Sequence, residues 1–125
     1  MSKIISNFKI TGYGSYLPPK IQTSKELSKV IGKSEDWIIS HTGVYERRIS
    51  DIDVDQMGAI AAKEAIGDKN PPDLIINASG VPKQTLPDTS VFMQKELGLE
   101  GIPSFSIHST CLSFIVALNS AASLL

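Results

Sequence analysis

The distribution of charge along the chain constrains the fold most strongly. All 12 basic and all 13 acidic residues lie at or before Glu100, so residues 101–125 carry no charged side chain. A small free-standing domain leaves much of its surface in water and rarely ends in a long uncharged segment. Either a partner covers this end, or the chain is a piece of a larger protein.

The uncharged end does not match a membrane anchor. Residues 112–125 include three Ser and one Asn, which makes this stretch too short and too polar to span a bilayer. The first ten residues lack the continuous apolar run of a signal peptide. We therefore expect a helix that is buried by protein, without membrane contact.

The remaining composition is that of an ordinary globular protein. The chain is 42% hydrophobic and 20% charged, with a net charge of −1, so it lacks the basic excess of a nucleic-acid-binding protein. Its single cysteine cannot form an internal disulfide. This predicts a reducing compartment, the cytoplasm.

Strand-like and helix-like segments alternate along the sequence. The expected strands cover residues 4–16, 73–79 and 104–109. The expected helices run from Thr23 or Ser24 to Gly32, from Ser34 to Gly43, from Asp53 or Asp55 to Ile66, from Asp88 to Gly98, and from Cys111 onward. Strands separated by helices predict an α/β fold with βαβ units and a mostly parallel sheet.

Cys111, the only cysteine, lies between the last expected strand and the uncharged helix. Open α/β sheets bind their ligands at the carboxyl ends of strands. Unpaired N–H groups at a helix N-terminus stabilise a thiolate or a developing oxyanion. Cys111 is therefore a candidate nucleophile, although free cysteines are often buried and an inert core cysteine is the alternative.

Three segments carry motifs of one enzyme family, in the same order and at the same separations. Residues 37–48 read W-I-I-S-H-T-G-V-Y-E-R-R, similar to W-I-x-x-R-T-G-I-x-x-R-R, and Leu86-Pro87 precedes a helix that ends in Leu-Gly. Residues 105–114 read F-S-I-H-S-T-C-L-S-F, similar to F-D-I-N-A-A-C-x-G-F. With these motifs the chain resembles the thiolase-like condensing enzymes, specifically 3-oxoacyl-(acyl-carrier-protein) synthase III.

The resemblance implies a thiolase-like α/β fold of which only a part is present. Residues 1–125 would form the N-terminal segment of the first βαβαβ half, with a buried nucleophile helix, and the C-terminal half would be absent from this chain. The family's catalytic His and Asn belong to that absent part. The resemblance therefore implies that this segment alone is inactive.

The resemblance also implies an activity, with acyl-CoA as a substrate and no cofactor or metal. Cys111 would accept an acyl group from acyl-CoA, and decarboxylation of malonyl-ACP would give the carbanion that attacks this thioester. The product would be a 3-oxoacyl-ACP at the start of fatty acid or related synthesis. The implied partners are the acyl carrier protein and, in the full-length protein, a second copy in a homodimer.

Five further residues match positions that bind substrate in the family. Trp37 would stack on the adenine of CoA, and Thr42 would contact the nucleotide. Arg47 and Arg48 would face CoA phosphates or the carrier protein, and Leu86 would reach across the dimer interface into the partner's acyl pocket. The alternatives are a packing anchor for the indole, a helix-cap or turn role for the threonine, a solvated loop pair for the arginines, and ordinary interface packing for the leucine.

Several residues depart from the family motifs. His41 replaces Arg, Ser106 replaces Asp, His108 replaces Asn, Ser109 and Thr110 replace two Ala, and Ser113 replaces Gly. We expect His108 to be a satisfied core residue and not a base. These changes leave the fold prediction unaltered and fit a divergent member with a primer other than acetyl-CoA.

Two other functions stay open on the sequence. One is an acyltransferase of the same fold, acting in secondary metabolism, that uses Cys111 without decarboxylation. The other is a noncatalytic interaction subunit, in which the uncharged end packs into a partner and Cys111 is inert.

Overall fold

The computed structural model describes residues 9–124 of the chain. The described residues form two compact units, 17–52 on the one hand and 9–16 with 53–124 on the other. We call them the ribbon unit and the sheet unit. No helix of the described residues is long and apolar enough to cross a membrane.

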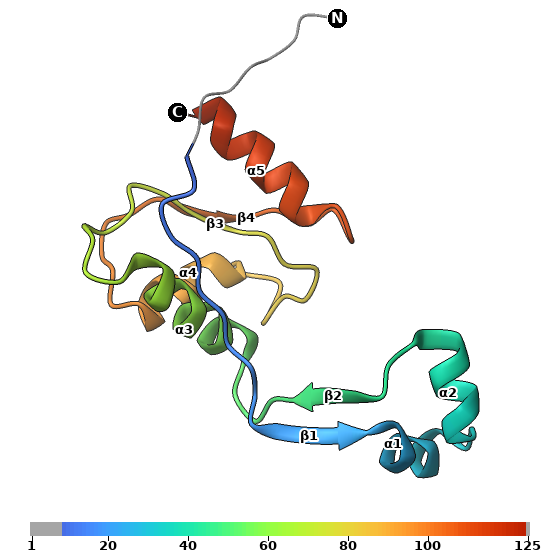
Figure 1. Ribbon diagram of the computed structural model, residues 1–125. Helices are drawn as coiled ribbons and strands as arrows, with labels where there is room; N and C mark the ends of the chain where they lie inside the picture. The colour runs from blue at the N-terminus through green and yellow to red at the C-terminus, as the bar shows by residue number, and fades with distance from the viewer. Residues whose placement is uncertain (1–8, 125) are drawn as a thin grey trace, which may run out of the picture. The chain divides into compact units, whose positions relative to one another are not determined.

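The ribbon unit consists of two short strands and two helices (Figure 1). Strands β1 (Lys20–Thr23) and β2 (Glu46–Ile49) pair antiparallel, with Ile21 opposite Arg48. Helices α1 (Ser24–Ile31) and α2 (Glu35–Thr42) lie between them in the chain. The strands were not predicted, because four-residue strands with several charged side chains lack an apolar alternation.

Both helices of the ribbon unit begin and end where the sequence predicts. Thr23 and Glu26 form a capping box at the start of α1, and the Ser34 hydroxyl accepts the Trp37 N–H at the start of α2. Gly32 and Gly43 end the two helices in the left-handed conformation, with φ of 67° and 69°. Such local signals depend on neighbouring residues alone, so the sequence reveals them.

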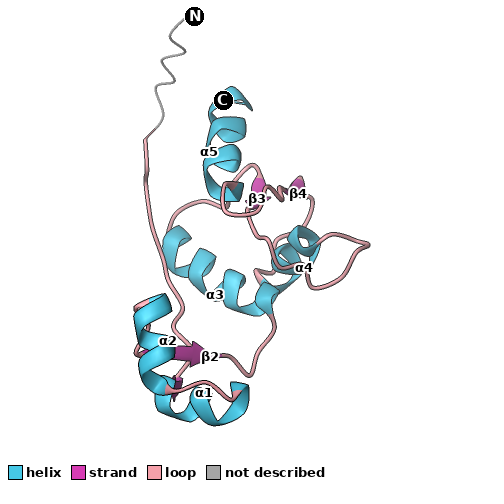
Figure 2. Ribbon diagram, turned by 90° about the vertical axis from the view of Figure 1, so that its right-hand side faces the viewer, coloured by secondary structure: helices cyan, strands magenta, loops and turns pink. Residues whose placement is uncertain are grey.

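The sheet unit has helices on both faces of a parallel strand pair (Figures 1 and 2). Strands β3 (Ile75–Asn77) and β4 (Ser104–Ser106) pair in parallel, with Ile76 opposite Phe105. Helix α4 (Thr89–Glu96) packs on one face and α5 (Ser113–Leu124) on the other, while α3 (Val54–Ile66) packs against α4. This arrangement confirms the predicted α/β class, although both strands are shorter than predicted.

The first predicted strand, residues 4–16, is wrong where it can be compared. Residues 4–8 lie outside the described residues, and residues 9–16 form no strand. They pass along α3 instead, where the Ser15 N–H donates to Glu64 over 2.8 Å. A Cβ on Gly12 or Gly14 would overlap a carbonyl oxygen of α3. The glycines are therefore needed for the close approach of this segment to helix α3.

The sequence predicts that α5 is buried by protein, but most of this helix is not buried by the described residues. Only Ser113 and Ala117 of the helix are buried. Phe114 is 66% exposed, and Leu112 and Ile115 are exposed as well. The described residues cover a single side of the helix, since the β3–β4 pair is the layer that packs on it.

The contact between Gly14 and α3 gives a first test. We expect Gly14→Ala to destabilise the protein by about 3 kcal/mol, because the new methyl group would overlap the backbone of Ala61, which cannot move without disturbing the helix. Gly58→Ala is the matched control, since its methyl group would meet the flexible side chain of Met93 at 3.0 Å. Urea unfolding measures both, and equal stabilities of the two variants would contradict the prediction.

Candidate active site

Cys111 lies in a tight connection between β4 and α5. The chain leaves β4 after Ser106, and α5 begins at Ser113, two residues after the cysteine. Thr110 has a φ of 48°, in the left-handed region that β-branched residues rarely adopt. Strained backbone of this kind occurs preferentially at functional sites. The Cys111 thiol is free and exposed, so the alternative of a buried core cysteine is wrong for the described residues.

Ser113 holds this connection together. Its buried hydroxyl accepts the Ser109 N–H over 2.9 Å and donates to the Thr110 carbonyl over 2.7 Å. The Leu112 N–H donates to the Ser109 carbonyl over 2.9 Å. These bonds compensate for the unfavourable φ at Thr110 and fix the backbone on both sides of Cys111. The family motif has Gly at this position, so the serine adds a bond that glycine lacks.

Asp88 ties the start of α4 to β4. One carboxylate oxygen accepts the Ser90 N–H over 2.8 Å and the Ser106 hydroxyl over 3.1 Å, and the other accepts the Ser106 N–H over 3.2 Å. Partial burial raises the pKa of Asp88, but the hydrogen bonds from Ser90 and Ser106 outweigh it, so its pKa lies below the ordinary value. Ser106 stands where the family motif has Asp, and Asp88 brings a carboxylate to the same strand.

A pocket of about 300 Å³ opens beyond the carboxyl ends of β3 and β4. Its lining residues are Asn77, Ser79, Gly80, Pro82, Gln84, Thr85, Asp88, Thr89, Ser106 and His108. His108 is exposed here, so the prediction of a satisfied core residue is wrong. The physical reason is that His108 follows the end of β4 and lines this pocket beside Gly80, beyond the strand residues on which the helices pack.

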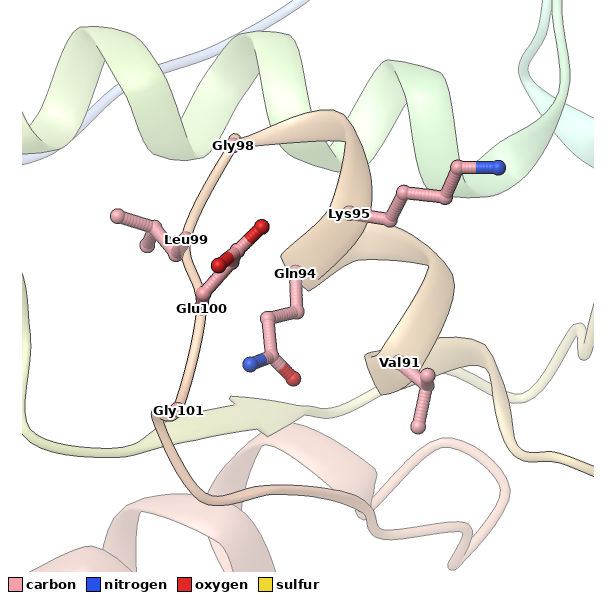
Figure 3. A pocket seen from close by; sticks show the side chains of 7 residues that line it. All are labelled: Val91, Gln94, Lys95, Gly98, Leu99, Glu100 and Gly101. Atoms are coloured by element: carbon pink, nitrogen blue, oxygen red, sulfur yellow. The ribbon is translucent and has the colours of Figure 1, made fainter.

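A second pocket, of about 360 Å³, lies at the other end of β4 (Figure 3). It is lined by Val91, Gln94, Lys95, Gly98, Leu99, Glu100 and Gly101. The Gln94 side chain already accepts the Ser104 hydroxyl over 3.1 Å. These residues precede β4 and Cys111 follows it, so this pocket does not belong to the thiol site.

Trp37 lies half-exposed on α2, with 41% of its surface accessible. The His41 ring stacks on the indole with the ring centroids 4.3 Å apart, and the Lys33 ammonium lies 5.3 Å from the indole centroid. The Lys33 ammonium is therefore within cation–π distance of the indole. A core position for Trp37 is therefore wrong for the described residues, whereas a packing anchor at the surface agrees with this exposure.

The other residues of the first motif have structural contacts of their own. The Thr42 hydroxyl donates to the Ile38 carbonyl over 2.7 Å and accepts the Val44 N–H over 3.1 Å, which agrees with the turn role that was the alternative to nucleotide contact. Arg47 and Arg48 lie on β2, so a loop pair is wrong. Successive strand residues point to opposite faces: the Arg47 guanidinium donates to the Ser24 hydroxyl over 3.4 Å, and the Arg48 guanidinium donates to the Pro18 carbonyl over 3.3 Å.

The structure divides the predicted site residues between the two units. Trp37, Thr42, Arg47 and Arg48 lie in the ribbon unit. Cys111 and Leu86 lie in the sheet unit, where Leu86 is 82% exposed. Among residues 9–124, no group of three or more His, Cys, Asp or Glu side chains is arranged to hold a metal ion.

Comparison with known proteins identifies the family. The chain is 40% identical over 119 residues to beta-ketoacyl-(acyl-carrier-protein) synthase III 1 of Vibrio parahaemolyticus, a match that covers 90% of this chain. It is 38% identical over 123 residues to the synthase III of Clostridium acetobutylicum. The chain belongs to the 3-oxoacyl-(acyl-carrier-protein) synthase III family. It spans 38% of the length of either relative.

Solved structures give the same assignment. The synthase III of Aquifex aeolicus superposes with a TM-score of 0.86 at 38% identity, covering 93% of this chain and 39% of that chain. The priming beta-ketosynthase of the R1128 polyketide pathway superposes with a TM-score of 0.82 at 30% identity, covering 92% of this chain and 36% of that one. The chain therefore has the thiolase-like fold of this synthase family. No family model matches the sequence.

Sequence reasoning missed the residues that fix the site from a distance. Asp88 was predicted as a helix start, but nothing local indicates its bonds to Ser106, 18 residues later. Lys83 lies 2.8 Å from Asp55, which is 28 residues earlier in the chain. No spacing rule links residues so far apart, so only the packed structure reveals these pairs.

The low pKa of Asp88 predicts how stability depends on pH. The carboxylate stabilises the fold fully above its ordinary pKa of 3.8, and this contribution is lost as the pH falls through the lower pKa of the folded state. We therefore expect Asp88→Asn to lower the free energy of unfolding at pH 6 by about 2 kcal/mol. Urea unfolding of both proteins at pH 6 and pH 3 measures this difference in the free energy of unfolding. A difference at pH 3 as large as that at pH 6 would contradict the lowered pKa of Asp88.

Proposed function

We propose that this chain contributes the nucleophile to a condensing enzyme that forms 3-oxoacyl-ACP from acyl-CoA and malonyl-ACP. The observation that carries the proposal is the free, exposed thiol of Cys111 in a fixed connection between the carboxyl end of β4 and the start of α5. The family membership supports the same chemistry, since the relatives are named as 3-oxoacyl-ACP synthases.

In the first half-reaction, the Cys111 sulfur attacks the carbonyl carbon of acyl-CoA. A bond forms between this carbon and Sγ, the bond to the CoA sulfur breaks, and CoA leaves as a thiol with the proton from the cysteine. An acyl-cysteine thioester results. N–H groups at the start of α5 would stabilise the oxyanion that develops during the attack.

In the second half-reaction, malonyl-ACP loses carbon dioxide. The electron pair of the broken carbon–carbon bond forms the new bond to the acyl carbon, and Sγ leaves as a thiolate that takes up a proton. The enolate-like state needs hydrogen-bond donors. The family resemblance assigns these donors to a His and an Asn that are not among residues 1–125, so this segment by itself would not complete the condensation.

Several of the described residues would bind substrate in this proposal. Trp37 offers a half-exposed indole for stacking on adenine, and the Lys33 ammonium, 5.3 Å from the indole centroid, would attract phosphates. Thr42, Arg47 and Arg48 would complete the CoA contacts. Leu86 is exposed enough to enter the acyl pocket of a second copy in a homodimer. The enzyme would act in the cytoplasm, in fatty acid or related synthesis, with no cofactor.

Alkylation tests whether Cys111 is a nucleophile. We expect iodoacetamide to label Cys111 at neutral pH and a saturating acyl-CoA to block the labelling, because both reagents compete for the same thiol. Cys111→Ser is the control that removes the label. If labelling is absent, or proceeds unchanged with acyl-CoA, the noncatalytic interaction subunit becomes the better interpretation.

Carbon dioxide release separates condensation from simple acyl transfer. The full-length protein, supplied with acyl-CoA and malonyl-ACP, is expected to release carbon dioxide at a rate that falls about a thousandfold or more in Cys111→Ser. Acylation of Cys111 without carbon dioxide release would instead favour an acyltransferase of the same fold.

The size of the gene product tests the expected domain organisation. We expect the intact polypeptide to be considerably heavier than the 13.5 kDa of this sequence, because the relatives are longer than the matched region. Mass spectrometry of the purified protein measures this. A mass of 13.5 kDa without a partner chain would contradict the prediction that residues 1–125 are one segment of a synthase.

A further inference from the structure

A loop of residues 78–88 joins β3 to α4 (Figure 1). It carries Leu86, which is exposed. Residues 80–87 are all exposed. An exposed loop is usually mobile, and a mobile loop cannot present one apolar side chain at a defined position. Whatever fixes this loop therefore determines where Leu86 lies relative to the sheet unit.

Lys83 connects the loop to both helices beneath it. Its ammonium lies 2.8 Å from Asp55 Oδ2 and 3.1 Å from Asp53 Oδ2, at the start of α3. The same ammonium lies 5.2 Å from the centroid of the Phe92 ring on α4. The Lys83 N–H donates to the Thr89 hydroxyl, also on α4, over 2.9 Å. One residue of the loop thus bonds to two helices.

The pair with Asp55 is unusual because the carboxylate is buried. Asp55 is 1% exposed, and its Oδ1 has no hydrogen-bond partner. A buried carboxylate without a cation is strongly unfavourable. The Lys83 side chain, 30% exposed, supplies that cation, and its hydrogen bonds to Asp55 and Asp53 raise the pKa of Lys83 above the ordinary value. Release of the loop would therefore leave Asp55 buried and unpaired.

We propose that Lys83 is a positioning residue, which fixes the β3–α4 loop on α3 and α4 and thereby sets the place of Leu86 in the acyl pocket. The proposal deepens the proposed function and rests on it for the role of Leu86. Lys83 does not touch the reacting atoms. Its effect would appear in the choice between acyl chains, because Leu86 limits the space that the acyl group can fill.

Hydrogen exchange tests the loop without any assay of activity. In the full-length protein, we expect Lys83→Met to speed amide exchange of residues 81–86 by roughly tenfold or more. Lys95→Met is the matched control on the surface of α4, and it should leave the loop unchanged. The double variant Lys83→Met/Asp55→Asn leaves no unpaired buried charge at position 55, so it should fold even if the single variant does not. It should still show fast amide exchange of residues 81–86. Unchanged exchange in the double variant would overturn the proposal.

Acyl-chain selectivity tests the consequence. We expect the ratio of kcat/KM for a short acyl-CoA to that for a longer acyl-CoA to change by about fivefold in the double variant. The single variant Lys83→Arg keeps the cation, so it should have the same ratio as the wild-type protein. Faster exchange with an unchanged ratio would overturn the link to Leu86. A wild-type protein that releases no carbon dioxide would refute the proposed function, and the exchange result would still decide whether Lys83 fixes the loop.

Discussion

The carboxylate of Asp88 is the interaction on which the rest of the sheet unit depends. It accepts the Ser90 N–H at the start of α4 and, through Ser106, binds the strand that leads to Cys111. A helix start and a strand from different parts of the chain are thus held by one charged group. Because hydrogen bonds to a charged group are about twice as strong as neutral ones, this carboxylate sets the position of β4, and with it the starting point of the turn that carries the thiol.

Small polar side chains with hydrogen bonds also occupy buried positions in both units. Ser24, Ser90 and Ser113 are buried, and each hydroxyl is bonded to a neighbouring backbone or carboxylate oxygen. Small bonded side chains permit close approach between elements and fix their geometry, whereas several large apolar side chains of α5 remain exposed. Polar contacts therefore fix the local geometry of the described residues, and the apolar side chains of α5 are available for packing against other protein.

The sequence predicted the features that depend on neighbouring residues. The caps Ser34 and Asp88 were found from their side chains, and Thr23 and Asp53 are each one of the two caps that the sequence offered, because a cap acts within three residues of the helix end. The motif around Cys111 likewise predicted a strand, a turn and a helix in the right order. The sequence did not predict strands β1 and β2, which have too few residues for a hydrophobic pattern, or the exposure of His108, which depends on the layers around it.

By itself, the sequence determined the α/β class, the helix boundaries, the family and the identity of the candidate nucleophile, because these follow from composition, capping chemistry and contiguous motifs. Only the tertiary structure decided how the thiol and the loop are held. The bonds of Asp88 to Ser106 and of Lys83 to Asp55 join residues 18 and 28 positions apart, and such pairs form only when packing brings distant segments within hydrogen-bond distance. The physical reason is that capping acts within one turn of helix, while the burial of Asp55 is a property of the folded chain as a whole.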